Sequence, residues 1–230
     1  KVPDVAGITT TTAKVRVMDA NDSTVYDPSN TAFTIKGRVQ LLTPNGGQTL
    51  TVGVPYSITG NVYGPITGVN LYYSTNGVGG PYTALQSGNC DSVSVSAGTF
   101  TCNWNVQDLI GTNLAIKVAD ANNALVTDTS DAAFAIKGGV TITTPASTSL
   151  IWYAGDPVSI VWDRTGTIGN VDLFYSVNNG TYQAIASGVA SPSATGNSYA
   201  WTVPTTSIVS NNVKIKIDGT NLVAPFISPA

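Results

Sequence analysis

The chain has 230 residues, of which only 10% are charged, and its formal net charge is −3. All thirteen acidic residues are aspartates, and the chain contains neither glutamate nor histidine. Such a sequence has little charge with which to attract nucleic acid or an anionic membrane, and it lacks the side chains of the usual hydrolase and metal sites. Its 42% hydrophobic content favours a folded chain. We therefore expect no nucleic-acid partner, no direct membrane insertion and no enzymatic activity.

The sequence repeats itself about every hundred residues. Residues 25–37 (VYDPSNTAFTIKG) and 126–138 (VTDTSDAAFAIKG) match at eight of thirteen positions with an offset of 101. A fixed period of this length indicates an array of similar modules. We expect residues 1–37 (the first segment) to be the C-terminal strands of an incomplete module. Residues 38–137 (module 2) are expected to form a complete domain, and residues 138–230 (module 3) a domain that lacks its last strand.

The first segment is predicted to contain two strands, over residues 13–17 and 32–36, which match the last two strands of module 2. Four residues at the second strand are expected to pack against another module or another chain: Thr31, Phe33, Ile35 and Lys36. Two explanations stay open. The chain is a window on a longer covalent array, or the first segment completes module 3 of a neighbouring chain by strand exchange. Against strand exchange, module 3 already has its own copy of the first strand, at residues 213–217.

Modules 2 and 3 are predicted to consist of short strands with one buried face. Apolar and polar residues alternate over 158–162, 171–175 and 213–217, and module 2 has matching segments. Asparagine–glycine turn signals separate the strands, and no segment shows helical periodicity. The predicted fold class is all-β, as tandem immunoglobulin-like antiparallel β-sandwiches. Gly60 stands where module 3 has Trp162, so Phe100 or Trp104 is expected to fill the core of module 2.

One set of module 3 residues carries a resemblance to a known family: Pro145, Gly155, Ile160, Trp162, Val171, Leu173, Tyr175, Ser176, Trp201, Val203, Pro204, Lys214 and Lys216. This pattern resembles the immunoglobulin-like repeats of long bacterial cell-surface proteins, and it is also similar to repeats of fungal Ser/Thr-rich wall proteins. The resemblance covers nearly the whole chain. It implies a fold and an extracellular or cell-surface location, with other copies of the same repeat as partners, and it implies no activity.

Both cysteines of the chain, Cys90 and Cys102, lie in module 2. Their spacing is not that of a C-x-x-C motif, and no histidine or second cysteine pair supports a metal site. A disulfide is therefore favoured over a reactive or metal-binding thiol pair. Such a disulfide indicates an oxidising compartment.

Acidic stretches recur at one place in the repeat. Asp19, Asn21 and Asp27 of the first segment match Asp120, Asn122 and Asp128 of module 2. Oxygen donors at alternate positions suit calcium, whereas hairpin turns with Asx side chains explain the same residues. Apart from this calcium hypothesis, no cofactor is expected. Asn21 and Asn179 also begin glycosylation sequons.

Tyr72 and Phe174 occupy the same position of the repeat, with parity opposite to that of Leu71 and Leu173. They are therefore expected on the outer face of a sheet. There they would pack against another module or chain, stack on a carbohydrate, or form an ordinary cross-strand pair.

These observations predict a structural extracellular protein, a rod or filament of tandem immunoglobulin-like modules that strand exchange would complete head to tail. The alternatives are an adhesin or carbohydrate-binding stalk that recognises cell-surface glycans, and a non-catalytic accessory region of a secreted enzyme. Asp156 and Asp163 lie near Trp162, as carboxylates do in sugar-cleaving sites, but turn chemistry explains them better.

Overall fold

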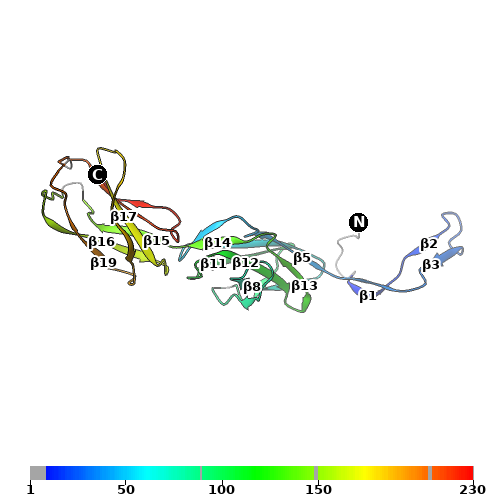
Figure 1. Cartoon of the computed structure of the whole chain (residues 1–230). Helices are drawn as coiled ribbons and strands as arrows, with labels where there is room; N and C mark the ends of the chain where they lie inside the picture. The colour runs from blue at the N-terminus through cyan, green and yellow to red at the C-terminus, as the bar shows by residue number, and fades with distance from the viewer. Residues whose placement is uncertain (1–8, 89, 148–149, 207–208, 230) are drawn as a thin grey trace. The chain divides into compact units, whose positions relative to one another are not determined.

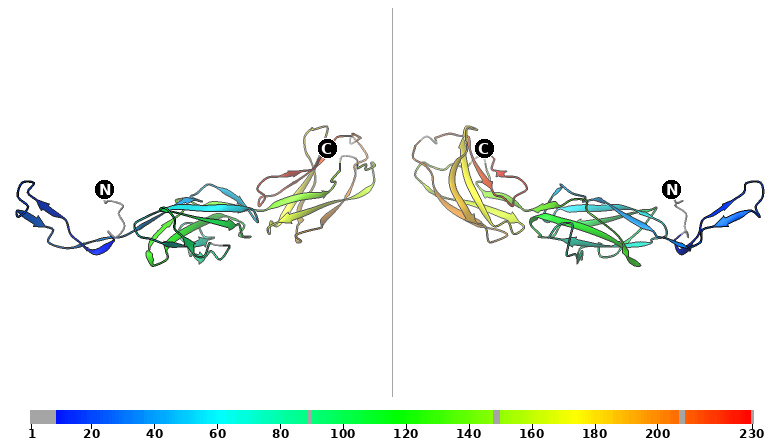
Figure 2. Two further views of the ribbon diagram at one scale, coloured as in Figure 1. Left: turned by 180° about the vertical axis from the view of Figure 1, so that it is seen from behind. Right: turned by 45° about the vertical axis from the view of Figure 1, so that its right-hand side comes forward.

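The computed structural model describes residues 9–88, 90–147, 150–206 and 209–229. Every regular element in these ranges is a β-strand (Figures 1 and 2). The described ranges therefore hold no helix of the length and hydrophobicity that crossing a membrane requires. Residues 1–8 of the first segment lie outside the described residues.

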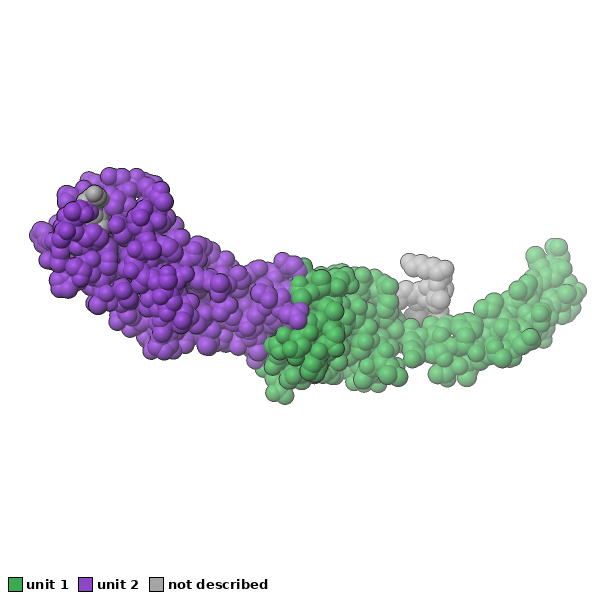
Figure 3. All heavy atoms as spheres, in the orientation of Figure 1, with its two compact units in different colours: residues 1–46, 57–104, 115–133 green, residues 47–56, 105–114, 134–230 purple. Residues whose placement is uncertain are grey.

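The chain divides into two compact units, which Figure 3 distinguishes by colour. Unit 1 comprises Lys1–Gly46, Ser57–Trp104 and Ala115–Ala133, and unit 2 comprises Gly47–Tyr56, Asn105–Leu114 and Phe134–Ala230. Module 2 contributes residues to both units, while module 3 belongs to unit 2 alone. The module boundaries drawn from the repeat remain predictions, and each unit is described by itself.

In unit 1, the first segment forms two separate antiparallel strand pairs. The strands are β1 (Thr10–Ala13), β2 (Arg16–Met18), β3 (Tyr26–Pro28) and β4 (Phe33–Ile35). β1 pairs with β4, and β2 pairs with β3. Two-stranded pairs bury little apolar surface. Accordingly, the side chains of Val17 and Phe33 are 73% and 42% exposed.

The module 2 part of unit 1 has strands in two sheets. The strands of the first sheet are β5 (Arg38–Thr43), β7 (Pro55–Tyr63) and β11 (Thr99–Asn105), in the order β11-β7-β5. The strands of the second are β8 (Gly68–Ser74), β9 (Thr83–Ala84), β10 (Val93–Ser94), β12 (Gly111–Asp120) and β13 (Asn123–Thr129). In this second sheet β8 pairs with β9, β10 and β12, and β12 also pairs with β13. All these pairings are antiparallel. Large, fully buried side chains of unit 1 come from both sheets, among them Ile58, Leu71, Phe100, Trp104 and Ile116.

Phe100 fills the core of module 2 beside Gly60. A Cβ atom on Gly60 would overlap the Phe100 ring and the Gln40 carbonyl oxygen. Glycine at this position therefore makes room for the phenylalanine ring, where module 3 instead has the large side chain of Trp162. Of the two residues that the sequence proposed for this role, Phe100 is the one against Gly60.

In unit 2, a short strand of module 2 is paired on both of its edges. β14 (Phe134–Lys137) runs parallel to β6 (Thr49–Thr51) and antiparallel to the start of β12. Phe134 and Ile136 are buried, and their strand partners in β12 are Leu114 and Gly111. The last strand of module 2 is thus held from two sides.

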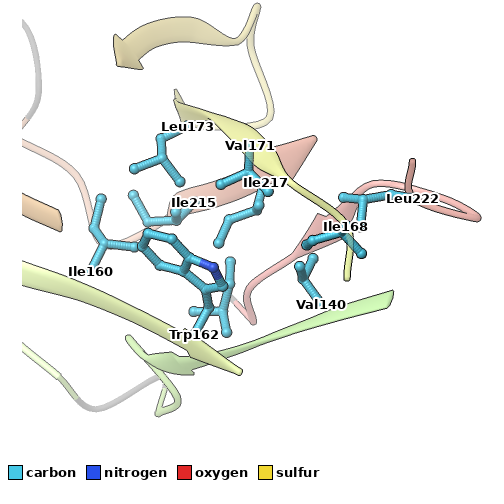
Figure 4. Close-up of a cluster of buried hydrophobic side chains, with 10 residues drawn as sticks. Val140, Ile160, Trp162, Ile168, Val171, Leu173, Ile215, Ile217 and Leu222 are labelled. Atoms are coloured by element: carbon cyan, nitrogen blue, oxygen red, sulfur yellow. The ribbon is translucent and has the colours of Figure 1, made fainter. Parts of the chain in front are cut away.

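Module 3 is a sandwich of two antiparallel sheets. One sheet contains β15 (Gly139–Thr144), β16 (Pro157–Thr165) and β19 (Asn197–Thr202), in the order β15-β16-β19. The other contains β17 (Asn170–Val177), β18 (Gln183–Ala190), β20 (Val213–Asp218) and β21 (Phe226–Ile227), in the order β18-β17-β20-β21. Trp162 of the first sheet lies among Ile160, Leu173 and Ile215 in a core to which both sheets contribute (Figure 4). The predicted all-β, immunoglobulin-like sandwich class is confirmed.

A buried serine fastens the strand that follows β12 in module 2. The Ser130 amide donates to the Ile116 carbonyl oxygen at 2.9 Å, and the Ile116 amide donates to the Ser130 hydroxyl oxygen at 3.0 Å. The Ser130 hydroxyl donates in turn to the Pro44 carbonyl oxygen at 2.8 Å. Three serines make this reciprocal contact with the backbone of another residue: Ser29 with Val15, Ser130 with Ile116, and Ser228 with Ile215. We call this contact the serine clasp.

Replacing Ser130 by alanine tests the serine clasp. Ser130→Ala leaves the buried Ile116 amide without its hydroxyl partner, and such a loss costs about 1–3 kcal/mol of unfolding free energy. Ser29→Ala is the matched control, because it removes the same contact where the Val15 side chain is exposed. Denaturant unfolding of the chain should show a clear loss for Ser130→Ala and a small one for Ser29→Ala. Equal losses would mean that burial of the clasp does not matter.

Candidate functional site

A glycine that permits close packing joins successive modules. Gly138 lies between β14 and β15, and a Cβ atom on it would overlap the Ile168 side chain and the Thr165 carbonyl oxygen. Gly37 has the same position in the repeat, and a Cβ atom there would lie 2.8 Å from Cδ1 of Ile66. The Gly37 contacts lie within unit 1, and the Gly138 contacts lie within unit 2. The same glycine–isoleucine contact is therefore built twice. We call the contact at Gly37 the first glycine joint and the contact at Gly138 the second glycine joint.

Hydrogen bonds fix the backbone at the second glycine joint. The Gly138 amide donates to the Asn221 carbonyl oxygen at 2.9 Å, and the Val223 amide donates to the Gly138 carbonyl oxygen at 3.0 Å. The Asn221 side-chain amide donates to the Ile168 carbonyl oxygen at 3.0 Å. Both polar groups of Gly138 are thus bonded to the loop that follows β20.

Side chains of module 2 that belong to unit 2 extend the same joint. Ile110 packs against the core of module 3, and the Thr167 hydroxyl donates to the Asp108 carboxylate at 2.6 Å. Gly166 has a φ of +79°, and a Cβ atom on it would lie 2.9 Å from Cγ2 of Val52. Both the conformation and the space therefore favour glycine at this position.

Lysine side chains cover the aromatic residues predicted on the outer sheet faces. In module 2, Lys117 Nζ lies 4.6 Å from the ring centre of Tyr72 and 4.8 Å from that of Tyr82. In module 3, Lys216 Nζ lies 4.3 Å from the Phe174 ring centre and 5.0 Å from that of Tyr182. Each lysine is directly opposite its first aromatic partner across two paired strands. Cation–π attraction therefore stabilises both stacks.

These two stacks agree with the cross-strand alternative for Tyr72 and Phe174. Packing of either ring against another module or chain stays a prediction. Partial burial also raises the pKa of the Tyr82 phenol through desolvation. The repeat alignment could have drawn attention to these lysines, because Lys117 and Lys216 occupy matching positions.

The leading aspartates of the acidic stretches form Asx turns. The Asp19 carboxylate accepts a hydrogen bond from the backbone amide of Asn21 at 2.7 Å. The Asp120 carboxylate accepts one from the backbone amide of Asn122 at 2.9 Å. Among the described residues, no three His, Cys, Asp or Glu side chains gather as a metal site would require. The geometry agrees with the turn alternative, and we develop no calcium function from it.

Asp27 and Asp128 match in the repeat but differ in their surroundings. The Asp128 carboxylate accepts a hydrogen bond from the Leu41 amide at 2.7 Å, where the pairing of β5 with β7 changes register between Leu41 and Thr43. Asp27 is exposed in β3. Sequence analysis missed the structural role of Asp128, because its partner lies 87 residues away.

The predicted disulfide is confirmed. Cys90 and Cys102 are bonded with their Cα atoms 5.3 Å apart, and both residues are buried. The two sequon asparagines are exposed, Asn21 in a turn of the first segment and Asn179 after β17. The Asn179 side-chain oxygen accepts a hydrogen bond from Lys214 Nζ at 2.8 Å.

The residues predicted to pack between modules or chains lie in and beside β4. Phe33 and Ile35 pair with Ala13 and Thr10 of β1, so β4 already has a partner on one edge. Thr31 and Lys36 flank the strand and are exposed, as is Phe33. The intermodule or interchain role of these four residues stays a prediction.

No family model and no curated protein matches this chain. Among solved structures, it is similar to fibronectin(III)-like modules of Clostridium thermocellum CbhA, with 17% identity over 83% of this chain and 91% of that chain and a TM-score of 0.27. It is also similar to titin A168169, with 10% identity over 82% of this chain and 93% of that chain and a TM-score of 0.37. A third similar structure is Rst D1–D2, with 12% identity over 83% of this chain and 96% of that chain and a TM-score of 0.34. Because these scores are low, the fold assignment rests on the strand pairing of this chain.

Two adjacent glycines provide a matched test of the second joint. Gly138→Ala forces a Cβ atom against Ile168 and Thr165, which should cost about 1–3 kcal/mol. Gly139→Ala is the control, because no atom lies within 4 Å of its added Cβ. Hydrogen exchange should accelerate at the amides of Gly138 and Val223 in the first variant only. Unchanged exchange in Gly138→Ala would show that the packing at this joint is dispensable.

Proposed function

We propose that this chain is a structural protein that works outside the cell, as tandem immunoglobulin-like modules that form a rod or filament. The observation that carries the proposal is the repeated glycine joint. Gly37 with Ile66 and Gly138 with Ile168 make the same contact at successive module boundaries. A joint that is built twice in one way, with no spare residue for a flexible linker, favours a protein whose task is to connect modules firmly.

The strand pairing of module 2 suits a chain under tension. β6 lies near the start of the module and β14 at its end, and the two strands run parallel. Tension between the module ends therefore loads their hydrogen bonds in shear, so that several bonds must break together. The amide of Val52 donates to the Lys137 carbonyl oxygen at 3.0 Å and adds to this pairing.

The remaining features support an extracellular setting without catalysis. The Cys90–Cys102 disulfide persists in an oxidising compartment. The sequence has neither histidine nor glutamate, the side chains that most general acid–base sites use. Its low charge also argues against nucleic acid as a partner. On this proposal, other copies of the repeat are the main partners.

Single-molecule stretching tests the structural function. Module 2 should unfold in one abrupt step, because its β6–β14 pairing breaks in shear. Reducing the disulfide should lengthen that step by about 40 Å. The two cysteines are 12 residues apart in the sequence, and the loop between them can then extend by about 3.5 Å per residue. Gradual extension of module 2 without an abrupt step would contradict a tension-bearing role.

A second function, adhesion through a bound glycan, is favoured by one observation. Aromatic rings of module 3 line an open apolar cavity, and the Tyr153 side chain there is 69% exposed. Exposed apolar patches with aromatic rings are frequent binding surfaces. Trp152 and Trp201 lie in edge-to-face contact in the same cavity, with ring centres 6.2 Å apart.

A glycan panel tests adhesion. On this second function, a sugar that binds the chain should lose its binding in Tyr153→Ala. Tyr72→Ala and Phe174→Ala serve as comparators, because these rings are covered by lysines on other sheet faces. Loss of binding in the comparators alone would move the site to the lysine stacks. Binding of no glycan at all would contradict the adhesive function and leave the structural one standing.

A further inference from the structure

Three strands of module 2 end beside one short turn of module 3. The turn comprises residues 165–168, at the end of β16, and we call it the 165–168 turn. On the module 2 side, Val52 directly follows β6, Gly138 directly follows β14, and Ile110 directly precedes β12. β14 pairs with β6 on one edge and with the start of β12 on the other. All these residues belong to unit 2.

Gly166 of the turn lies against the side chains beside β6 and β12. A Cβ atom on Gly166 would lie 2.9 Å from Cγ2 of Val52 and 3.1 Å from Cδ1 of Ile110. Both distances are shorter than an ordinary van der Waals contact, so the two side chains fill the space that a side chain at this position would need. A larger residue in place of Gly166 would therefore push both of them away.

Ile168 of the same turn contacts the end of β14. A Cβ atom on Gly138 would overlap the Ile168 side chain, and it would lie 3.4 Å from Cδ1 of Ile110. Ile168 is itself buried in the hydrophobic core of module 3 (Figure 4). Because that core holds the 165–168 turn in place, the contacts of all three strand ends depend on the folded state of module 3.

These contacts lie at the end of β14 that tension reaches first. A pull from the module 3 side enters module 2 through Gly138, next to Lys137, the last residue of β14. The Val52 amide donates to the Lys137 carbonyl oxygen at 3.0 Å. Gly138 and Val52, on the two sides of this hydrogen bond, both contact the turn. The turn thus supports the first bond of the β6–β14 pairing that such a pull loads.

The first glycine joint follows the same plan with a smaller side chain. In the repeat, Gly64 takes the place of Gly166, and Thr9 takes the place of Ile110. A Cβ atom on Gly64 would lie 3.2 Å from Cα of Gly37 and 3.6 Å from Cγ2 of Thr9. The packing of this turn against the preceding part of the chain is therefore a feature of the repeat and occurs at both joints.

We propose that the 165–168 turn of module 3 braces the tension-bearing strands of module 2, so that the folded state of module 3 sets the force at which module 2 yields. The inference rests on the proposed structural function and states how one module regulates the strength of the module before it. With the turn in place, the ends of β6, β12 and β14 are supported from outside their own module. In repeat arrays, contacts between nearest neighbours of this kind add to the stability of each repeat.

Two glycines of module 3 provide a matched test of the brace. Gly166 and Gly169 both have a φ of +79°, so alanine strains the backbone equally at either position. Gly166→Ala also forces a Cβ atom against Val52 and Ile110, whereas a Cβ atom on Gly169 would meet only Asn221 Nδ2, at 4.0 Å. Hydrogen exchange of the Val52 amide should accelerate about tenfold in Gly166→Ala and stay unchanged in Gly169→Ala. Unchanged exchange in Gly166→Ala, or equal acceleration in both variants, overturns the proposal.

Stretching of the whole chain tests the regulation of strength. Leu173→Asp places a carboxylate in the fully buried core of module 3 and should prevent that module from folding, which faster exchange of the Ile215 amide would report. The abrupt step of module 2 should then move to a lower force than in the unmodified chain. A step of module 2 at unchanged force, although module 3 is unfolded, overturns the proposal.

The two tests separate the brace from the structural function. If module 2 extends without an abrupt step in every variant, its tension-bearing role is contradicted, while accelerated Val52 exchange in Gly166→Ala still supports the brace. If module 2 yields abruptly at the same force with module 3 folded or unfolded, the structural function stands and the brace is overturned.

Discussion

The backbone of β14, hydrogen-bonded on both edges, is the interaction on which the other features of module 2 depend. A strand edge left open exposes donors and acceptors that another chain can bind, and a buried edge without partners is costly. By lying between β6 and the start of β12, β14 satisfies both edges and buries Phe134 and Ile136. Its position also brings the chain directly to Gly138, where the close contacts of the second glycine joint begin. The position of β14 thus accounts for the burial of Phe134 and Ile136, for the second glycine joint and for the parallel pairing with β6 that resists tension.

The modules satisfy their polar groups with short uncharged side chains and with aspartates that bind backbone amides. Ser130 bridges β12 and the segment after β13, while Asp128 caps an amide at the register change of β5. Asn45 and Asp131 bond to each other across 86 residues. Because these contacts join segments far apart in sequence, they fix which strands are neighbours as well as holding them together.

Period and alternation were sufficient to predict the fold class and most strands of modules 2 and 3. In the first segment the strand predicted over residues 13–17 was wrong, because the chain there is divided between β1 and β2. The predicted inward positions Ile160, Trp162 and Leu173 are all fully buried. What could not be predicted are contacts that depend on tertiary proximity. Nothing in the local pattern distinguishes Gly138, where an added Cβ atom would overlap Ile168, from Gly139, where an added Cβ atom would meet no other atom within 4 Å. The lysine stacks were within reach of the sequence, because alignment of the repeats places Lys117 and Lys216 together, but only the cross-strand register links them to Tyr72 and Phe174.

The serine clasp has a consequence for the media in which such a protein can work. Its hydroxyl and backbone groups carry no charge, so dissolved ions do not screen them and acid does not protonate them. Within the described ranges only one ion pair occurs, between Lys216 and Asp218. The chain has no histidine, the side chain that ordinarily changes charge between pH 5 and 8. The strength of the serine clasp should accordingly be the same in fresh water and in brine.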